Sequence, residues 1–185
     1  MAGNIMTKPY KFIKFLQKKH RKNNESVRKY VADKQKKFQE AKEMRENLNW
    51  AVLGTGVIAN EMAQALQKMG KSLYAVGNRT HQKAVDFAEK YGVGKVYDQI
   101  GDMFEDKNVD IIYITSPHNT HYAFMKKALQ HGKHLLVEKS ITLNSRELNQ
   151  MIALAQEKHL ILAEAMTIWH MPIYKKLWYI VKEGA

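Results

Sequence analysis

The sequence predicts an α/β fold in which helices cover a doubly wound, mostly parallel sheet of about six strands. Two observations support this prediction. From residue 48 onward, short apolar runs alternate with longer amphipathic segments, which is the pattern of βαβ units. Glycines at positions 70, 92 and 132 stand where three of the amphipathic segments end, and glycine is common just after a helix.

Each element follows from these patterns. Short apolar runs predict strands at residues 49–53, 72–76, 95–97, 110–115, 134–137 and 160–163. Apolar residues at helical spacing predict helices at residues 58–69, 82–90, 121–130, 145–158 and 173–182. Asn144 or Thr142 is the expected cap of the fourth helix.

The composition is that of an ordinary globular protein. The 185 residues suit one full domain, and a hydrophobic fraction of 45% is enough for a packed core. The sequence contains no cysteine, which excludes disulfide scaffolds, cysteine-bearing zinc sites, iron–sulfur clusters and thiol catalysis. No apolar run reaches the roughly 18 residues that a spanning helix needs. We therefore expect no membrane span and a cytoplasmic location.

The positive charge is concentrated near the N-terminus. The formal net charge is +12, and residues 1–49 contribute +9 of it with 14 basic and 5 acidic side chains. The remaining residues carry only +3, which is normal for an enzyme domain. This contrast predicts two parts, a basic helical extension at residues 1–47 and a domain at residues 48–185.

The extension has two interpretations. Its apolar residues predict two short amphipathic helices around the polar segment at residues 18–24. Such helices either pack locally through a narrow apolar stripe or offer a surface to a partner chain, an anionic membrane or nucleic acid. We favour local packing and do not expect nucleic-acid binding. Met44 is an alternative natural start, because the first strand begins five residues later.

A glycine-rich turn follows the first predicted strand and opens the first helix. Its sequence is Gly54-Thr55-Gly56-Val57-Ile58-Ala59, a G-x-G-x-x-A pattern. The first glycine permits a tight turn, the second lets backbone N–H groups approach a pyrophosphate, and the alanine permits close packing of helix and strand. The position of the turn predicts a dinucleotide site of the Rossmann type. The alternative is a glycine turn that only reverses the chain.

The segment after the second strand indicates which dinucleotide binds. An NAD site usually has an acidic residue here, which holds the ribose 2′-hydroxyl. This chain has Asn78, Arg79 and Thr80 instead. A guanidinium pairs with a 2′-phosphate, and no carboxylate at these positions repels it. We expect NADP, with NAD as the alternative. An arginine that is merely solvent-exposed is the other interpretation.

Five segments together resemble the glucose-fructose oxidoreductase, inositol dehydrogenase and rhizopine-catabolism family (Gfo/Idh/MocA), in particular its dihydrodiol and xylose dehydrogenase-like members. The resemblance spans residues 50–185. The segments are Gly54 to Ala59, Asn78-Arg79, Thr115 to His121, Gly132 to Ser140 and Ala163 to Met166. The resemblance implies a nicotinamide cofactor and a sugar, polyol or related hydroxyl substrate.

In that family an E-K-P motif follows the fifth strand, and its lysine serves in proton transfer next to the nicotinamide. The matching residues are Glu138 and Lys139, so the resemblance implies that Lys139 is catalytic. Ser140 stands where the family has proline. Losing proline restores an N–H group and removes a fixed φ, so we expect a less rigid loop that keeps its lysine.

The turn after the fourth strand completes the expected site. Ser116, Pro117 and His118 lie where open α/β sheets bind ligands, and the resemblance places them beside the nicotinamide ribose. His121 either lies near the cofactor, as the resemblance implies, or is a capping or packing residue. The histidine pairs 118/121 and 131/134 have no clear third ligand, so no metal site is predicted.

Members of the family carry a second α/β domain that holds most substrate contacts, and we expect this chain not to contain it. The first hypothesis is therefore the NADP-binding part of an oxidoreductase that is not efficiently active alone. Substrate groups supplied by another chain, for example in a homo-oligomer, would complete it. The alternative is a non-catalytic nucleotide-binding or interaction module that uses the basic extension. The third hypothesis is that the chain is a remnant of an enzyme and has no retained function.

Overall fold

The computed structural model describes residues 32–33, 36 and 48–183. The chain divides into two units, Met1–Asn47 and Leu48–Ala185, and the fold described below is that of the second. The two amphipathic helices expected near the N-terminus lie almost entirely outside the described residues, and so does Met44.

Six strands form one sheet in the order β3-β2-β1-β4-β5-β6, and every neighbouring pair is parallel. The strands are β1 (Trp50–Leu53), β2 (Ala75–Gly77), β3 (Lys95–Tyr97), β4 (Ile111–Ile114), β5 (His134–Val137) and β6 (Leu162–Glu164). The prediction of a six-stranded, doubly wound sheet is confirmed. The strand order reverses between β1 and β4, and loops at such a point leave a crevice for ligands.

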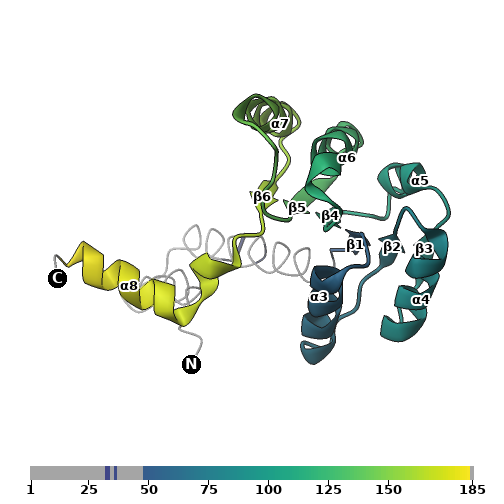
Figure 1. The fold of residues 1–185 in the computed structure, drawn as a ribbon, viewed down its shortest axis with the longest axis horizontal. Helices are drawn as coiled ribbons and strands as arrows, with labels where there is room; N and C mark the ends of the chain where they lie inside the picture. The colour runs from purple at the N-terminus through teal and green to yellow at the C-terminus, as the bar shows by residue number, and fades with distance from the viewer. Residues whose placement is uncertain (1–31, 34–35, 37–47, 184–185) are drawn as a thin grey trace. The chain divides into compact units, whose positions relative to one another are not determined.

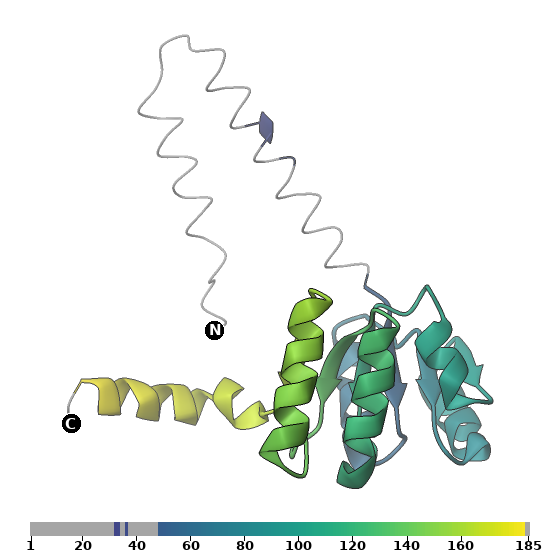
Figure 2. The same cartoon turned by 90° about the horizontal axis from the view of Figure 1, so that it is seen from above.

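Helices cover both faces of the sheet (Figures 1 and 2). Helices α3 (Val57–Lys68) and α4 (His81–Tyr91) lie on one face. Helices α5 (Ile100–Glu105), α6 (His118–Gln130) and α7 (Ser145–Glu157) lie on the other. The 3-10 turn η1 (Thr167–His170) and helix α8 (Pro172–Lys182) follow β6, and the apolar side chains of α8 are exposed.

Strand alternation divides the core in two. In β4, Ile112 and Ile114 belong to the cluster under α5, α6 and α7, whereas Tyr113 belongs to the cluster under α3 and α4. The second cluster contains small residues such as Ala59 and Ala63, which let α3 lie close to the sheet. Both faces of the strands are therefore buried, which explains why the strands read as continuous apolar runs.

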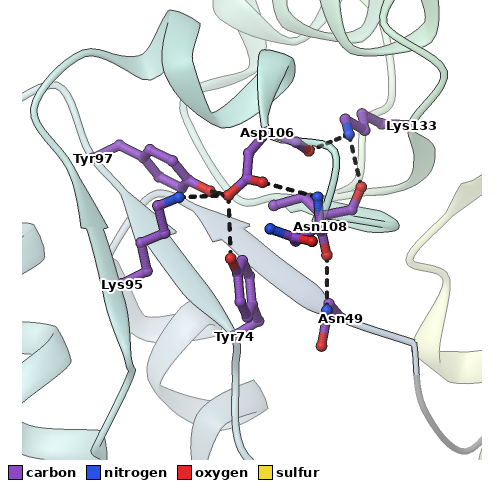
Figure 3. A network of polar contacts seen from close by, with 8 residues as sticks. Asn49, Tyr74, Lys95, Tyr97, Asp106, Asn108 and Lys133 are labelled. Atoms are coloured by element: carbon purple, nitrogen blue, oxygen red, sulfur yellow. Dashed lines mark hydrogen bonds and ion pairs between the residues drawn. The ribbon is translucent and has the colours of Figure 1, made fainter.

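A polar network closes the amino-terminal edge of the sheet (Figure 3). The carboxylate of Asp106 accepts hydrogen bonds from the hydroxyls of Tyr97 (2.6 Å) and Tyr74 (3.3 Å). It also accepts from Nζ of Lys95 (2.7 Å) and from the backbone N–H of Asn108 (2.8 Å). The Asn108 carbonyl in turn accepts from the amide of Asn49, which precedes β1. These bonds fix the segments that enter four strands.

Lys133 is a buried cation next to this network. Its ammonium group donates to the backbone carbonyls of Asp106 and Val109, the latter at 2.8 Å. Only 5% of the residue is exposed, and burial lowers the pKa of its ammonium group. Lys133 therefore holds the loop before β4 against the start of β5 (Figure 3).

Several predicted boundaries differ from the observed ones. Strand β2 begins at Ala75 rather than at residue 72, because pairing with β1 starts there. Helix α6 begins at His118, three residues before the predicted start, with Pro117 as its N-cap. Helix α5 and turn η1 were not predicted, because six and four residues are too few to show helical periodicity. Asn144 caps α7 as expected, accepting from the N–H of Glu147 at 3.0 Å.

No helix in the described part of the chain is both long enough and apolar enough to cross a membrane.

Candidate functional site

Three loops meet at the carboxyl-terminal edge of the sheet, opposite the Asp106 network. They are Gly54–Gly56 after β1, Asn78–Thr80 after β2, and Thr115–Pro117 after β4, and all nine residues line one cavity of about 540 Å³. The cavity lies at the reversal point of the strand order, which is where α/β sheets of this type bind ligands. Its size suits a small-molecule cofactor.

Gly54 is required by the turn itself. Its φ of +113° is a conformation that residues with a Cβ rarely adopt. Its N–H donates to the carbonyl of Gly77 at 2.8 Å, which ties the turn to β2. A Cβ at this position would lie 2.6 Å from Oγ1 of Thr115 and 3.1 Å from its carbonyl carbon. Only glycine therefore fits between β1 and β4.

Gly56 is different. Its φ of −73° is open to any residue, and a Cβ here would meet no protein atom within 4 Å. Nothing in the described fold requires glycine at this position. Gly56 nevertheless lines the cavity, so the space that a Cβ would fill is available to a ligand.

The first turn of α3 has free hydrogen-bond donors. Gly56 is the N-cap of this helix, no side chain caps it, and its first turn holds no acidic residue. The N–H groups of that turn have no intrahelical partner and attract an anion. A pyrophosphate beside Gly56 would satisfy them.

Asn60 fixes the carbonyls of the same turn. Its amide nitrogen donates to the carbonyls of Gly56 (2.8 Å) and Thr55 (3.2 Å). Its amide oxygen accepts from the Tyr91 hydroxyl (2.7 Å) and from Nζ of Lys90 (3.1 Å), both at the end of α4. Asn60 is a candidate site residue that the sequence did not reveal, because the glycine pattern ends at Ala59.

The loop after β2 forms the cationic side of the cavity. Asn78 donates to the carbonyl of Thr80 at 3.0 Å, which curls the loop, and Arg79 is exposed. Lys83, on the first turn of α4, also lines the cavity. Among the described residues that line it, none is Asp or Glu. The local charge therefore suits a ligand with an additional phosphate.

The turn after β4 is held by its own side chains. The hydroxyls of Ser116 and Thr120 lie 2.7 Å apart, and the Thr120 hydroxyl donates to the carbonyl of Pro117 at 2.7 Å. Asn119 and Thr120 extend the lining of the cavity onto the first turn of α6. Thr115 hydrogen bonds through Oγ1 to the carbonyl of Leu53 at 3.2 Å, which joins this turn to β1.

His121 lies inside the protein and not on the wall of the cavity. It is fully buried, with Nε2 2.8 Å from the carbonyl oxygen of Ser116 and Nδ1 3.2 Å from that of Ser140. Its ring also meets the ring of His118 edge to face, at 5.5 Å between centroids. His121 is therefore an internal residue that lies between two loops.

The loop after β5 carries Glu138 and Lys139. The Tyr113 hydroxyl donates to the carboxylate of Glu138, and the Lys139 N–H donates to the same carboxylate at 3.3 Å. Burial, followed by the bond to Glu138, raises the pKa of Tyr113. The N–H of Ile141 donates to Oε1 of Glu164 at 3.0 Å, and the Lys139–Ser140 peptide bond is cis. Lys139 itself is exposed.

Eight of the predicted site residues line the cavity: Gly54, Thr55, Gly56, Asn78, Arg79, Thr80, Ser116 and Pro117. The other six lie outside its lining: Val57, Ile58, His118, His121, Glu138 and Lys139. Val57 and Ile58 are exposed on the first turn of α3, and the remaining four lie on α6 or after β5. Cavity residues outside the prediction include Ile100 and Phe124, which only the folded chain brings there.

The chain matches the family model described as "Oxidoreductase family, NAD-binding Rossmann fold" (GFO_IDH_MocA) over residues 48–166. This range contains all six strands and the whole cavity.

Curated proteins with similar sequences include trans-1,2-dihydrobenzene-1,2-diol dehydrogenases. The Xenopus laevis enzyme is 29% identical over 139 residues, which cover 74% of this chain and 42% of that enzyme. The Sus scrofa enzyme is 30% identical over 133 residues, covering 70% of this chain and 40% of that enzyme. The chain thus spans about two fifths of the length of these relatives.

Similar solved structures include a 3-ketoreductase from Actinomadura kijaniata in complex with TDP-benzene and NADP, with a TM-score of 0.69 and 27% identity. The match covers 75% of this chain and 44% of that one. UDP-N-acetylglucosamine 3-dehydrogenase from Acidithiobacillus ferrooxidans matches with a TM-score of 0.65 and 27% identity, over 74% of this chain and 43% of that one.

Proposed function

Because the chain belongs to the Gfo/Idh/MocA oxidoreductase family with its NAD-binding Rossmann fold, we propose that it is the NADP(H)-binding part of an oxidoreductase. The substrate class in this proposal is a sugar, a polyol or a related hydroxyl or carbonyl compound. The names of the relatives support this class, since they act on a dihydrodiol or on sugar nucleotides. Residues 48–185 form the cofactor domain in this proposal, and residues 1–47 form a separate basic extension.

The observation at Gly56 carries the proposal. Protein atoms leave the position of its Cβ empty, and the uncapped N-terminus of α3 lies beside it. A pyrophosphate explains both facts, because it needs close backbone approach and free N–H donors.

The remaining loops fit the other parts of a dinucleotide. Asn78, Arg79 and Thr80 would hold the adenosine ribose and its 2′-phosphate, and the cavity presents no carboxylate to repel it. NADP is therefore the preferred cofactor, with NAD as the alternative. Ser116 and Pro117 would lie along the nicotinamide ribose. His118 at the start of α6, and Glu138 and Lys139 after β5, would lie next to these two residues.

Lys139 is the proposed catalytic residue. A bound nicotinamide supplies hydride exchange. When the substrate hydroxyl is oxidised, the unprotonated amine of Lys139 would accept the hydroxyl proton at Nζ as the hydride passes from the substrate carbon to the nicotinamide, and the ammonium group so formed would return that proton in the reverse direction. The exposed side chain of Lys139, at the carboxyl end of β5, is free to reach a substrate there.

We expect cofactor binding without efficient turnover by the 185-residue chain. Hydride transfer needs a substrate held in near-attack geometry. The chain spans about two fifths of its relatives, so the groups that position the substrate would come from elsewhere, for example from a second copy of the chain. A cytoplasmic location remains part of the same proposal.

Titration of the purified chain with NADPH and NADH, followed by cofactor fluorescence, tests the proposal. Gly56→Asp places a carboxylate against the pyrophosphate position and should abolish binding. Gly94→Asp is the matched control, because Gly94 lies just before β3 at the opposite edge of the sheet and has room for a Cβ.

Tighter binding of NADPH than of NADH, lost in Gly56→Asp and kept in Gly94→Asp, is the expected result. Absence of binding of both nucleotides to the folded wild-type chain would refute the proposal. Efficient turnover of a sugar or diol by the chain alone would refute the expectation of binding without activity.

A further inference from the structure

His121 touches two loops that the sequence keeps far apart. It projects from the first turns of α6 and is fully buried. Nε2 lies 2.8 Å from the Ser116 carbonyl oxygen, and Nδ1 lies 3.2 Å from the Ser140 carbonyl oxygen. Ser116 belongs to the turn after β4, and Ser140 to the loop after β5.

The two loops have different places in the site. Ser116 lines the cavity, whereas Ser140 follows Lys139, the proposed proton-transfer residue. Strands β4 and β5 are parallel neighbours, so their carboxyl ends lie side by side. Both loops lie on the far side of the β1 turn from Arg79, which is the side of the nicotinamide in a dinucleotide site.

The chemistry of the imidazole suits a connection of this kind. Each ring nitrogen faces a carbonyl oxygen, which can only accept a hydrogen bond. A neutral ring donates to one of the two carbonyls in each tautomer, and a protonated ring donates to both. An apolar side chain of similar size would leave both carbonyls without this donor.

The loop after β5 is also held at two other points. Glu138 is bound by the hydroxyl of Tyr113 from β4, and the N–H of Ile141 is bound by Glu164 at the end of β6. Hydrogen bonds from three different elements therefore restrain a loop in which Ser140 replaces the family's proline. Among these contacts, the one made by His121 also reaches the wall of the cavity.

We propose that His121 is a positioning residue that holds the Ser116 turn and the Lys139 loop together and so shapes the nicotinamide half of the site. This inference rests on the proposed function. It assigns His121 no contact with the cofactor. It predicts that losing the imidazole impairs recognition of the nicotinamide half and leaves recognition of the adenosine half intact.

Two ligands separate the two halves. NADPH reports on the whole site, and the rise in its nicotinamide fluorescence on binding reports on the nicotinamide environment. The ligand 2′,5′-ADP occupies only the adenosine half, and its affinity is measured by calorimetry. Both ligands are titrated into the full chain and into His121→Phe, His121→Gln and His131→Phe.

The expected result is differential. His121→Phe weakens NADPH binding about tenfold and reduces the fluorescence rise, while 2′,5′-ADP binds within about twofold of wild type. His121→Gln restores part of both NADPH signals, because its amide can donate to one of the carbonyls. His131→Phe is the matched control, since His131 is exposed just after α6, hydrogen bonds through Nδ1 to the carbonyl of Lys127, and lies beside the ring of Phe104 rather than at the cavity.

Other outcomes would overturn either this inference or the proposed function on which it rests. Equal loss of both ligands in His121→Phe, or no loss of either, would show that the imidazole has no special role in the nicotinamide half. Failure of both His121 variants to fold would make it a core residue only. Failure of the wild-type chain to bind either ligand would instead overturn the proposed function.

Discussion

Gly54 and Thr115 are packed so closely that a Cβ on residue 54 would lie 2.6 Å from the Oγ1 atom of Thr115. The two residues directly follow β1 and β4, the strands between which the sheet order reverses. Their contact brings the glycine turn and the Ser116 turn to the same cavity. The fold therefore depends on Gly54 through packing and through its positive φ.

Gly54→Ala should destabilise the protein. A non-glycine residue at φ +113° is strained, and its Cβ would clash with backbone atoms of Thr115 at 3.1 Å. Strain and overpacking together are expected to lower the free energy of unfolding by about 3 kcal/mol. Urea denaturation of Gly54→Ala measures this loss. Gly94→Ala is the control, and equal stabilities for the two variants would contradict the prediction.

Gly56→Ala should weaken cofactor binding and leave the stability of the fold nearly unchanged. Its Cβ meets no protein atom within 4 Å, so the free energy of unfolding should stay within about 1 kcal/mol of wild type. NADPH affinity should fall at least about tenfold, because the methyl group occupies the approach to the pyrophosphate. Urea denaturation of one preparation measures the free energy of unfolding, and fluorescence titration of the same preparation measures the NADPH affinity. Unchanged affinity would mean that the ligand does not approach this turn.

Arg79→Ala should reduce the preference for NADPH over NADH. A guanidinium bound to a 2′-phosphate makes charge-assisted hydrogen bonds, and their loss costs about 1.5–3 kcal/mol, or roughly a tenfold to a hundredfold in NADPH affinity. NADH affinity should change little. Arg146→Ala on α7 is the matched control, since Arg146 is exposed and does not line the cavity. A parallel loss of NADH binding would assign Arg79 to adenine stacking rather than to the phosphate.

The sequence predicted the elements that follow a strong local pattern. Strands β3 and β5 were predicted at their observed bounds, because each ends in apolar residues that a polar segment follows at once. The glycine turn was recognisable because its residues are adjacent along the chain. Helix α5 was missed because its six residues make less than two turns.

The relations that build the site are mostly non-local and could not be predicted in this way. The packing of Gly54 against Thr115 joins residues 61 positions apart, and no local signal marks it. The role of Asn60 depends on the end of α4, about thirty residues on. For His121 the sequence left two readings open, because the positions of its two carbonyl partners follow only from the parallel pairing of β4 and β5.

Asp106→Asn should destabilise the opposite edge of the sheet. The bonds from Lys95, Tyr97 and the N–H of Asn108 hold the pKa of Asp106 well below its ordinary value of 3.8. Lys95 is 44% exposed, so water screens its attraction, and most of the stabilisation should come from the hydrogen bonds to the nearly buried carboxylate. We expect the variant to lose about 2 kcal/mol of unfolding free energy at pH 7.

The pH dependence gives this prediction a second test. A carboxylate whose pKa is depressed by folding stabilises the protein fully above the ordinary pKa, and that contribution declines as the pH falls toward the folded-state pKa. The stability difference between wild type and Asp106→Asn should therefore be constant above pH 5 and shrink below about pH 4. Asp98→Asn is the control, because its carboxylate lies 3.2 Å from Nε2 of His81 but is 83% exposed, so this contact should contribute little to stability. Urea denaturation at several pH values measures the difference, and a difference that grows at low pH would show that the carboxylate is not stabilised in the folded state.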